Sequence, residues 1–188
     1  EYRLNLDMLT VVQSKKNYGA PQKKIIGIHP GRGGASRPWE PKRYRQLLAL
    51  LESRQDYSVV LMGGGAKELA LIDELRPLPT NAFNRVNVPI SDLLTDVAAC
   101  DVFVGIDSGP MHVASACQVP VVYLALNKRQ KPAQWGPWRS PHLTLRDFSA
   151  CDIACFPDRC PEDFCSQHVS AHQVLAGIEY FADGKALP

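Results

Sequence analysis

Residues 101–124 of the sequence read DVFVGIDSGPMHVASACQVPVVYL and contain two strand patterns joined by a short helix pattern. The runs Asp101–Ile106 and Val121–Leu124 are rich in β-branched and aromatic residues, which suits buried strands. Between them, the small residues of Met111–Cys117 suit a helix. Two such strands joined through a helix predict a right-handed crossover between parallel strands.

The same alternation continues on both sides of this stretch and predicts an α/β fold with a doubly wound parallel sheet. Four further strands are predicted at Ile25–Ile28, Ser58–Met62, Arg85–Val88 and His142–Leu145. One helix is predicted to begin at Pro41 and another at a cap residue, Ser91. Two more are predicted from the apolar positions Leu69, Ile72 and Leu75, and Val169, Val174, Ile178 and Phe181.

The composition is that of one globular domain. Of the 188 residues, 45% are hydrophobic and 21% are charged, and the formal net charge is +2. So small a charge argues against a nucleic-acid partner, which requires a dense basic face. No stretch reaches ~18 consecutive apolar residues, and the start of the chain lacks the apolar centre of a signal peptide, so we predict a cytoplasmic protein. The chain begins with Glu1, which is compatible with a piece of a longer protein.

Three unusual loops follow predicted strands directly: His29–Trp39, Gly63–Glu68 and Asp107–His112. The carboxyl ends of parallel strands lie at one edge of a sheet, where open α/β folds bind their ligands. Glycine-rich turns let backbone N–H groups approach an anion, and the helix from Pro110 directs its positive N-terminus to the same place. The three loops together predict an anion site, although no Walker A or G-x-G-x-x-G motif is present.

Each of these features also has a purely structural interpretation. The glycines can serve only tight turns, Asp107 can cap its helix, and His112 can be a packed side chain. Trp135 and Trp138 are predicted to be core or rim residues, with the lining of a ligand pocket as the alternative. The tetrad Asp-Ser-Gly-Pro followed at once by Met-His is harder to explain by capping alone, which favours the functional interpretation.

Several motifs together resemble glycosyltransferase family 9, the heptosyltransferases that build the inner core of bacterial lipopolysaccharide. The resemblance covers roughly residues 24–148, and its most specific part is the motif Asp107–His112. The other motifs are His29-Pro30-Gly31, Arg37-Pro38-Trp39, Gly64-Gly65-x-x-Glu68 and Val119-Pro120-Val121-Val122. The family usually has lysine where Arg37 stands, and this departure leaves the exact sugar open.

The resemblance implies a GT-B enzyme, in which two Rossmann-like halves face each other across a cleft. This chain is similar only to the C-terminal half, which binds the donor, usually ADP-heptose. Transfer to a lipopolysaccharide-core or protein acceptor would be inverting and would need no cofactor, with the general base on the missing N-terminal acceptor domain. Through its acceptor, the enzyme could associate peripherally with the inner face of the membrane.

The resemblance also implies roles for single residues. Asp107 and Arg37 would be the catalytic residues beside the sugar, and Arg37 would also contact the diphosphate. The implied donor-binding residues are Gly31, Arg37, Glu68 at the ribose, Ile90 at the base, Asp107, Ser108 and Gly109 at the diphosphate, and His112 in support of the phosphate site.

Four of the six cysteines crowd near the end of the chain: Cys151, Cys155, Cys160 and Cys165. In a reducing compartment such clustering favours metal, so we predict a structural thiolate site for iron or zinc, with two disulfides or four free thiols as alternatives. Some members of the resembled family hold iron in a similar cysteine-rich tail. The other two cysteines, Cys100 and Cys117, are predicted to be inert core residues.

We therefore expect four segments along the chain. They are a linker remnant at 1–22, the nucleotide-sugar-binding Rossmann-like domain at 23–148, a cysteine-rich segment at 149–168, and a closing helix with a tail at 169–188. Two alternatives remain for the function: another GT-B nucleotide-sugar enzyme or an epimerase, and a non-catalytic module that binds a nucleotide or a metal.

Overall fold

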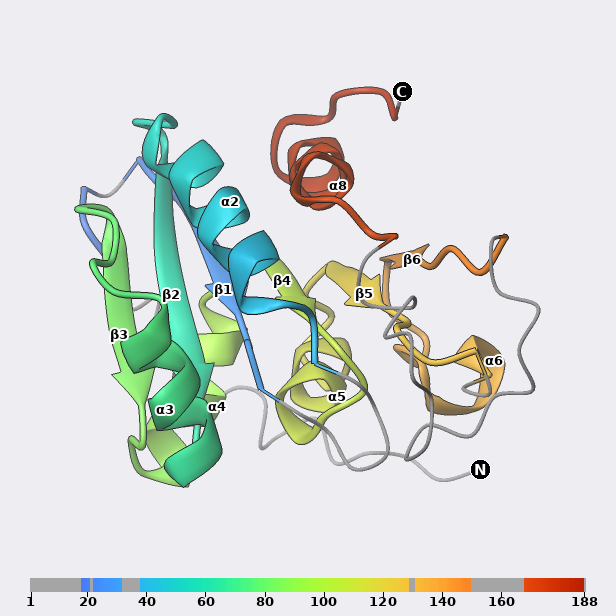
Figure 1. Ribbon diagram of the computed structural model, residues 1–188, viewed down its shortest axis with the longest axis horizontal. Helices are drawn as coiled ribbons and strands as arrows, with labels where there is room; N and C mark the ends of the chain where they lie inside the picture. The colour runs from blue at the N-terminus through green and yellow to red at the C-terminus, as the bar shows by residue number, and fades with distance from the viewer. Residues whose placement is uncertain (1–17, 21, 32–37, 129–130, 150–167, 188) are drawn as a thin grey trace.

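A parallel sheet of six strands forms the centre of the protein in this computed structural model (Figure 1). The structure describes residues 18–20, 22–31, 38–128, 131–149 and 168–187. The strand order across the sheet is β3-β2-β1-β4-β5-β6, and every neighbouring pair is parallel. The strands are β1 (Lys24–Ile28), β2 (Tyr57–Gly63), β3 (Ala82–Val86), β4 (Val102–Gly105), β5 (Val121–Leu124) and β6 (His142–Leu145).

Helices cover both faces of this sheet (Figure 1). The described helices are α2 (Pro41–Glu52), α3 (Ala66–Glu74), α4 (Ile90–Ala98), α5 (Gly109–Ala116), α6 (Pro132–Trp135) and α8 (Ala171–Asp183). Buried side chains of α2, α3 and α8 join one core layer, and those of α4 and α5 join the other. The predicted doubly wound α/β fold is therefore confirmed.

The alternation of side chains along the strands divides the core into these two layers. On β1, Ile26 and Ile28 face the layer of α2 and α8, whereas Ile25 faces the layer of α4 and α5. Every residue of β2 and β4 is buried. Because central parallel strands are covered on both sides, their sequences are continuous hydrophobic runs, which is the pattern that predicted them.

Helix α2 shows how the local sequence forms an element. Pro41 suits the first turn because its N–H would have no helical partner there, and the four apolar positions at helical spacing are all buried: Tyr44, Leu47, Leu48 and Leu51. Just before the helix, Trp39 is fully buried with its ring edge-on to Tyr44. Its Nε1 donates to the carbonyl of Val169 at 2.9 Å, which ties the start of α2 to the segment that enters α8.

The structure corrects the predicted position of β3, which spans Ala82–Val86 instead of Arg85–Val88. The strand begins earlier because Asn81, just before it, donates its amide to two carbonyls, those of Leu51 and Tyr57. It ends at Val86 because Asn87 has a φ of 63°, in the left-handed region that a strand cannot use.

The predicted cap of α4 is wrong. Ser91 lies inside the first turn, and Pro89 occupies the cap position with an extended backbone. The carbonyl of Pro89 already accepts the N–H groups of Asp92, at 2.9 Å, and Leu93, at 3.0 Å. Because proline fixes φ near the helical value and its carbonyl opens the hydrogen-bond ladder, the helix starts at Ile90 without a side-chain cap.

The chain leaves β1 and β4, which are neighbours in the sheet, toward opposite sides. β1 is followed through α2 by β2, and β4 is followed through α5 by β5, on the other side of the sheet. The strand order reverses between these two strands, and ligands of open α/β sheets bind outside the carboxyl ends at such a point. The described residues of the three predicted loops share this edge of the sheet, as expected for parallel strands.

Two cysteines and two tryptophans test the remaining expectations for the core. Cys100 is buried, and burial raises the pKa of its thiol, which fits an inert core residue. Cys117 is half-buried, and burial also raises its thiol pKa. Trp135 and Trp138 lie on the surface rather than in the core. Within the described ranges, no helix combines the length and apolar character that crossing a membrane requires.

Candidate functional site

The loop after β4 opens into helix α5 through Ser108, which is the cap residue with an extended backbone (φ −161°, ψ 160°). The Ser108 side chain makes no capping hydrogen bond, and its buried Oγ has no hydrogen-bond partner among the described residues. Asp107 precedes the cap, so the interpretation of Asp107 as the helix cap is not supported. The N-terminus of α5 therefore presents backbone N–H groups that no side chain caps.

Asp107 and His112 form a pair beside this helix end. Asp107 Oδ1 lies 3.2 Å from His112 Nε2. His112 is exposed and is therefore not the packed side chain of the structural interpretation. Gly109, also exposed, has open space around it, since a Cβ atom built there would meet nothing within 4 Å. The motif thus brings a carboxylate, an imidazole and an open helix N-terminus to one place, as predicted.

His29 lies buried in the loop after β1, the strand next to β4 in the sheet. The N–H of His29 donates to the carbonyl of Val104 at 3.0 Å, which continues the pairing of β1 with β4 beyond the strand. The side chain is only 5% exposed, and its Nδ1 has no hydrogen-bond partner among the described residues. Burial lowers the pKa of His29 to about 4, although the nearby Glu68 carboxylate opposes this shift. The imidazole is therefore neutral at pH 7.

The turn after β2 carries Glu68 toward His29. Gly65 has a φ of 106°, which side-chain-bearing residues rarely adopt, and its N–H donates to Asn87 Oδ1 at 2.7 Å. This turn places Glu68 in the first turn of α3, half-buried, with its carboxylate close to Gly31. Gly31 and Glu68, which the sequence predicted as separate donor-binding residues, thus meet at one point.

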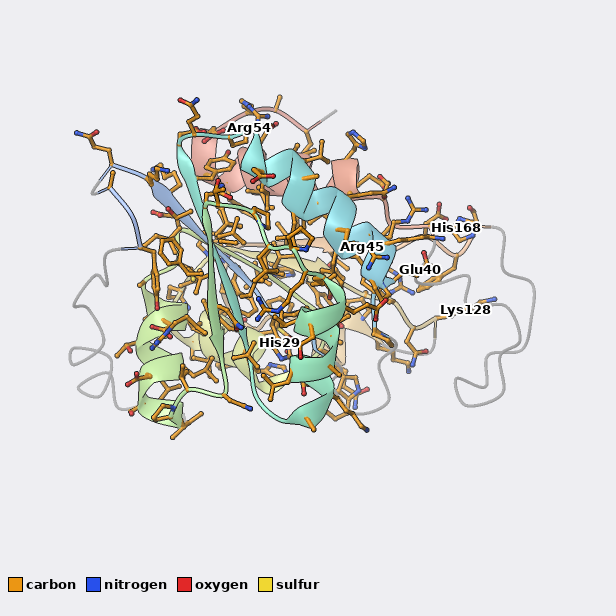
Figure 2. All side chains as sticks on the ribbon, turned by 60° about the vertical axis from the view of Figure 1, so that its left-hand side comes forward. His29, Glu40, Arg45, Arg54, Lys128 and His168 are labelled. Carbon is orange, nitrogen blue, oxygen red and sulfur yellow. The ribbon has the colours of Figure 1, made fainter. Side chains whose placement is uncertain are left out.

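A pocket of about 380 Å³ lies beside this point, between the loop after β1, the start of α2 and one side of α3. Its walls are mainly apolar, with Trp39 and several prolines, and charged groups at Lys67, Glu68 and Glu74. Figure 2 shows His29 between α2 and α3, whereas Lys128 and His168 lie toward one end of the molecule. Among the described residues, the pocket and the open end of α5 are features of the carboxyl edge that could receive a ligand.

Some predicted site residues are not brought into this group. Ile90 is 69% exposed at the start of α4, where it could contact a ligand only at the surface. Trp135 and Trp138 do not line the pocket. Arg37 and the four clustered cysteines lie outside the described residues. Among the described residues, no three histidine, cysteine, aspartate or glutamate side chains form a group that could hold a metal ion.

Two residues that the sequence did not assign to the site belong to this edge. His29 is one, and its position directly after a buried strand was the available signal. The other is Tyr123, fully buried on β5, whose hydroxyl has no hydrogen-bond partner among the described residues. Burial raises the pKa of Tyr123, and the charge of Asp107 raises it further. A tyrosine inside a strand pattern is typical of a core residue, so no sequence signal could have identified Tyr123 as part of the site.

The motifs at this edge match a known family. The model of glycosyltransferase family 9 (heptosyltransferase) matches residues 5–163, which is most of the chain. The chain belongs to glycosyltransferase family 9.

Relatives and solved structures agree with the family. The chain is 26% identical over 165 residues to lipooligosaccharide heptosyltransferase 2 of Campylobacter jejuni subsp. jejuni serotype O:6, covering 84% of this chain and 51% of that protein. The glycosyltransferase family 9 structure from Veillonella parvula DSM 2008 has a TM-score of 0.68 at 18% identity, covering 95% of this chain and 51% of the other.

A second structure of similar fold is the dodecameric iron-containing heptosyltransferase TibC in complex with ADP-D-β-D-heptose. Its TM-score is 0.64 at 15% identity, with 88% of this chain and 46% of that chain covered. Likenesses at such identities show the fold alone. The chain spans about half the length of the curated relatives it matches.

Proposed function

We propose that this chain is the donor-binding half of a glycosyltransferase that transfers heptose from ADP-heptose to a lipopolysaccharide-core or protein acceptor. The observation that carries the proposal is the end of α5, where Ser108 leaves the helix N-terminus uncapped beside Asp107. A helix N-terminus favours a phosphate, and Gly109 leaves room for it to approach the backbone. Family membership supplies the class of reaction.

In the proposed reaction, the anomeric carbon of the sugar forms a bond to the acceptor hydroxyl oxygen. The acceptor proton passes to a general base on the other half of the enzyme, and the bond from the anomeric carbon to the diphosphate breaks with its electron pair remaining on the diphosphate. Arg37 and the N–H groups at the start of α5 stabilise the charge that develops on this leaving group. Asp107 lies beside the sugar, and His112 holds the Asp107 carboxylate at 3.2 Å.

Glu68 and Ile90 complete the proposed donor site. Glu68 accepts hydrogen bonds from the ribose hydroxyls, and the exposed Ile90 offers an apolar contact to the base. An acceptor linked to lipid would bring the enzyme to the inner face of the membrane. The proposed enzyme includes an acceptor-binding half as well, because the chain spans about half the length of the curated relatives it matches.

The test is calorimetric titration of the chain with ADP, with UDP as the control nucleotide. We expect ADP to bind in preference to UDP, and we expect Ser108→Ala to weaken ADP binding roughly tenfold because a hydrogen bond to a charged group is lost. Arg37→Ala should weaken ADP binding more strongly, because it removes the positively charged side chain that is proposed to contact the diphosphate.

The matched control is Ser170→Ala, at the start of α8, which removes a serine cap far from the site and should leave ADP affinity unchanged. Equal ADP affinities for the wild-type chain and both site variants would contradict the donor-site assignment. Preference for UDP would instead favour another GT-B nucleotide-sugar enzyme.

We also propose that Cys151, Cys155, Cys160 and Cys165 hold a structural metal ion. The donor set supports this, because four thiols close in sequence suit tetrahedral iron or zinc, and one protein of similar fold is iron-containing. Elemental analysis of the purified chain should find about one iron or zinc per chain, and Cys155→Ser with Cys160→Ser should lower it. A metal content that is the same in the wild type and the double variant would contradict the assignment.

A further inference from the structure

His29 and Glu68 meet in a space that two glycines leave open at the ends of neighbouring strands. A Cβ atom built on Gly31 would lie 2.5 Å from both Cε1 and Nε2 of His29 and 2.7 Å from Glu68 Oε1. A Cβ atom built on Gly63 would lie 3.1 Å from Glu68 Cγ and 3.4 Å from His29 Cδ2. One edge of the imidazole and the carboxylate therefore face the same point, beside Gly31.

This geometry gives Gly31 a definite role. Real Cβ atoms do not approach other atoms to less than 3.0 Å, so any side chain at position 31 would displace the imidazole or the carboxylate. The imidazole cannot easily retreat, because His29 is buried and its N–H is bonded to the Val104 carbonyl. Gly31 is thus the residue that allows the two groups to approach each other.

The ring atoms of His29 differ in their surroundings. Nδ1 is buried without a hydrogen-bond partner among the described residues, and Nε2 lies on the edge that faces Gly31 and Glu68. A neutral imidazole carries a single N–H, and the low pKa of His29 keeps the ring neutral at pH 7. A proton on Nε2 points toward a carboxylate, whereas a proton on Nδ1 would be a buried donor without an acceptor.

We propose that His29 is a positioning residue, whose Nε2–H donates to the Glu68 carboxylate and fixes its orientation for the ligand hydroxyls. This inference rests on the proposed function, in which Glu68 binds the ribose of the donor. Among the described residues no hydrogen bond joins the two side chains, so the bond requires a rotation of the flexible Glu68 carboxyl group toward Nε2, which needs no ligand. His29 itself does not touch the donor.

Two substitutions distinguish the two ring nitrogens. The amide nitrogen of His29→Gln can occupy the place of Nε2, whereas that of His29→Asn reaches only the place of Nδ1. We expect His29→Gln to keep ADP affinity within about threefold of wild type and His29→Asn to lose roughly tenfold, as for the loss of a hydrogen bond to a charged group. In a Glu68→Ala background, His29→Asn should have no further effect. The proposal would be overturned if His29→Gln and His29→Asn lost ADP affinity equally. It would also be overturned if His29→Asn lost as much affinity in the Glu68→Ala background as in wild type.

A second measurement does not depend on nucleotide binding. Long-range nitrogen–proton NMR correlations of the chain should find the Nε2–H tautomer of His29 at pH 7, and Glu68→Gln should shift the Nε2 signal. The Nδ1–H tautomer, or a signal that Glu68→Gln does not move, would overturn the pairing. If wild type fails to bind ADP while His29 shows the expected tautomer and response, the proposed function fails and the pairing stands.

Discussion

Three buried polar atoms at the carboxyl edge of the sheet have no hydrogen-bond partner among the described residues: His29 Nδ1, Ser108 Oγ and the Tyr123 hydroxyl. Leaving such a group unpaired costs roughly 1–3 kcal/mol, so folded proteins keep few of them. These three come from the ends of β1, β4 and β5, which are neighbours in the sheet. The hydroxyls of Ser108 and Tyr123 at this edge fit a site whose polar groups are satisfied by a ligand.

His29 also makes a prediction about the pH dependence of stability. Its pKa is about 4 in the folded chain and about 6.5 when unfolded, so below pH 6.5 the unfolded chain binds a proton that the folded chain does not. Stability therefore rises with pH between pH 4 and 6.5 and falls on acidification through this window. From pH 7 to pH 5, we expect wild type to lose about 2 kcal/mol more than His29→Gln in urea unfolding. Equal losses in the two proteins would show that His29 is not the group responsible.

At the scale of elements, two helices that begin with serine differ in how their N-termini are completed. At α8, Ser170 Oγ accepts the N–H of Gln173 at 3.2 Å, and Gln173 Oε1 accepts the N–H of Ser170 at 2.8 Å, which is a capping box. At α5, the Ser108 side chain makes no such bond. α8 is therefore complete in itself, whereas α5 leaves its N–H groups available at the sheet edge.

This difference predicts effects of different size for the same substitution. Ser170→Ala should lower the free energy of unfolding by about 1 kcal/mol, because it removes a side-chain cap. Ser108→Ala should change it by less than about 0.5 kcal/mol, because no cap bond is lost. Denaturant unfolding of the two variants measures both effects. A larger loss of stability at Ser108 than at Ser170 would mean that the Ser108 hydroxyl serves the fold.

At the scale of the whole molecule, a buried ion cluster joins segments far apart in the chain. Asp96 in α4 is fully buried and accepts hydrogen bonds from the Tyr18 hydroxyl at 2.5 Å and from Arg85 Nε at 2.8 Å. Arg85 belongs to β3, and its Nη2 donates a hydrogen bond to Asp92 Oδ2 at 3.0 Å. The cluster fixes the segment before β1, which carries Tyr18, against the edge strand and its helix.

We expect Asp96→Asn to lower the free energy of unfolding by roughly 2–4 kcal/mol, because it removes the buried partner of a charged group and turns one acceptor into a donor. Asp92→Asn is the matched control, because Asp92 is the second carboxylate that accepts a hydrogen bond from Arg85. Because Asp92 is about half exposed, its loss should cost less than about 1 kcal/mol. Both values come from denaturant unfolding, and similar costs at the two positions would contradict a special role for the buried carboxylate.

The sequence alone determined most of the elements, because hydrophobic runs and helical spacing are local patterns, although the short helix α6 was not predicted. The strands β5 and β6 and the buried stripe of α2 were predicted to the residue, since hydrophobic runs and helical spacing depend only on neighbours along the chain. Parallel strands with exit loops on one edge follow from the alternation itself, whereas Ser108, Gly109, Glu68 and Gly31 were named as site residues from the family resemblance. Where a turn conformation decided a boundary, as at Asn87 and Pro89, the local pattern was insufficient.

Tertiary structure alone decided which of these residues meet. The approach of His29 and Glu68 to the same point depends on β1 and β2 being neighbours and on two glycines leaving space there. The unpartnered hydroxyls of Ser108 and Tyr123 depend on what packs around them, which no local pattern encodes. Residues distant in the sequence also bury His29, and this burial lowers the pKa of its imidazole. The sequence thus specified the elements and their order, and the packing of distant segments produced the polar environment of the site.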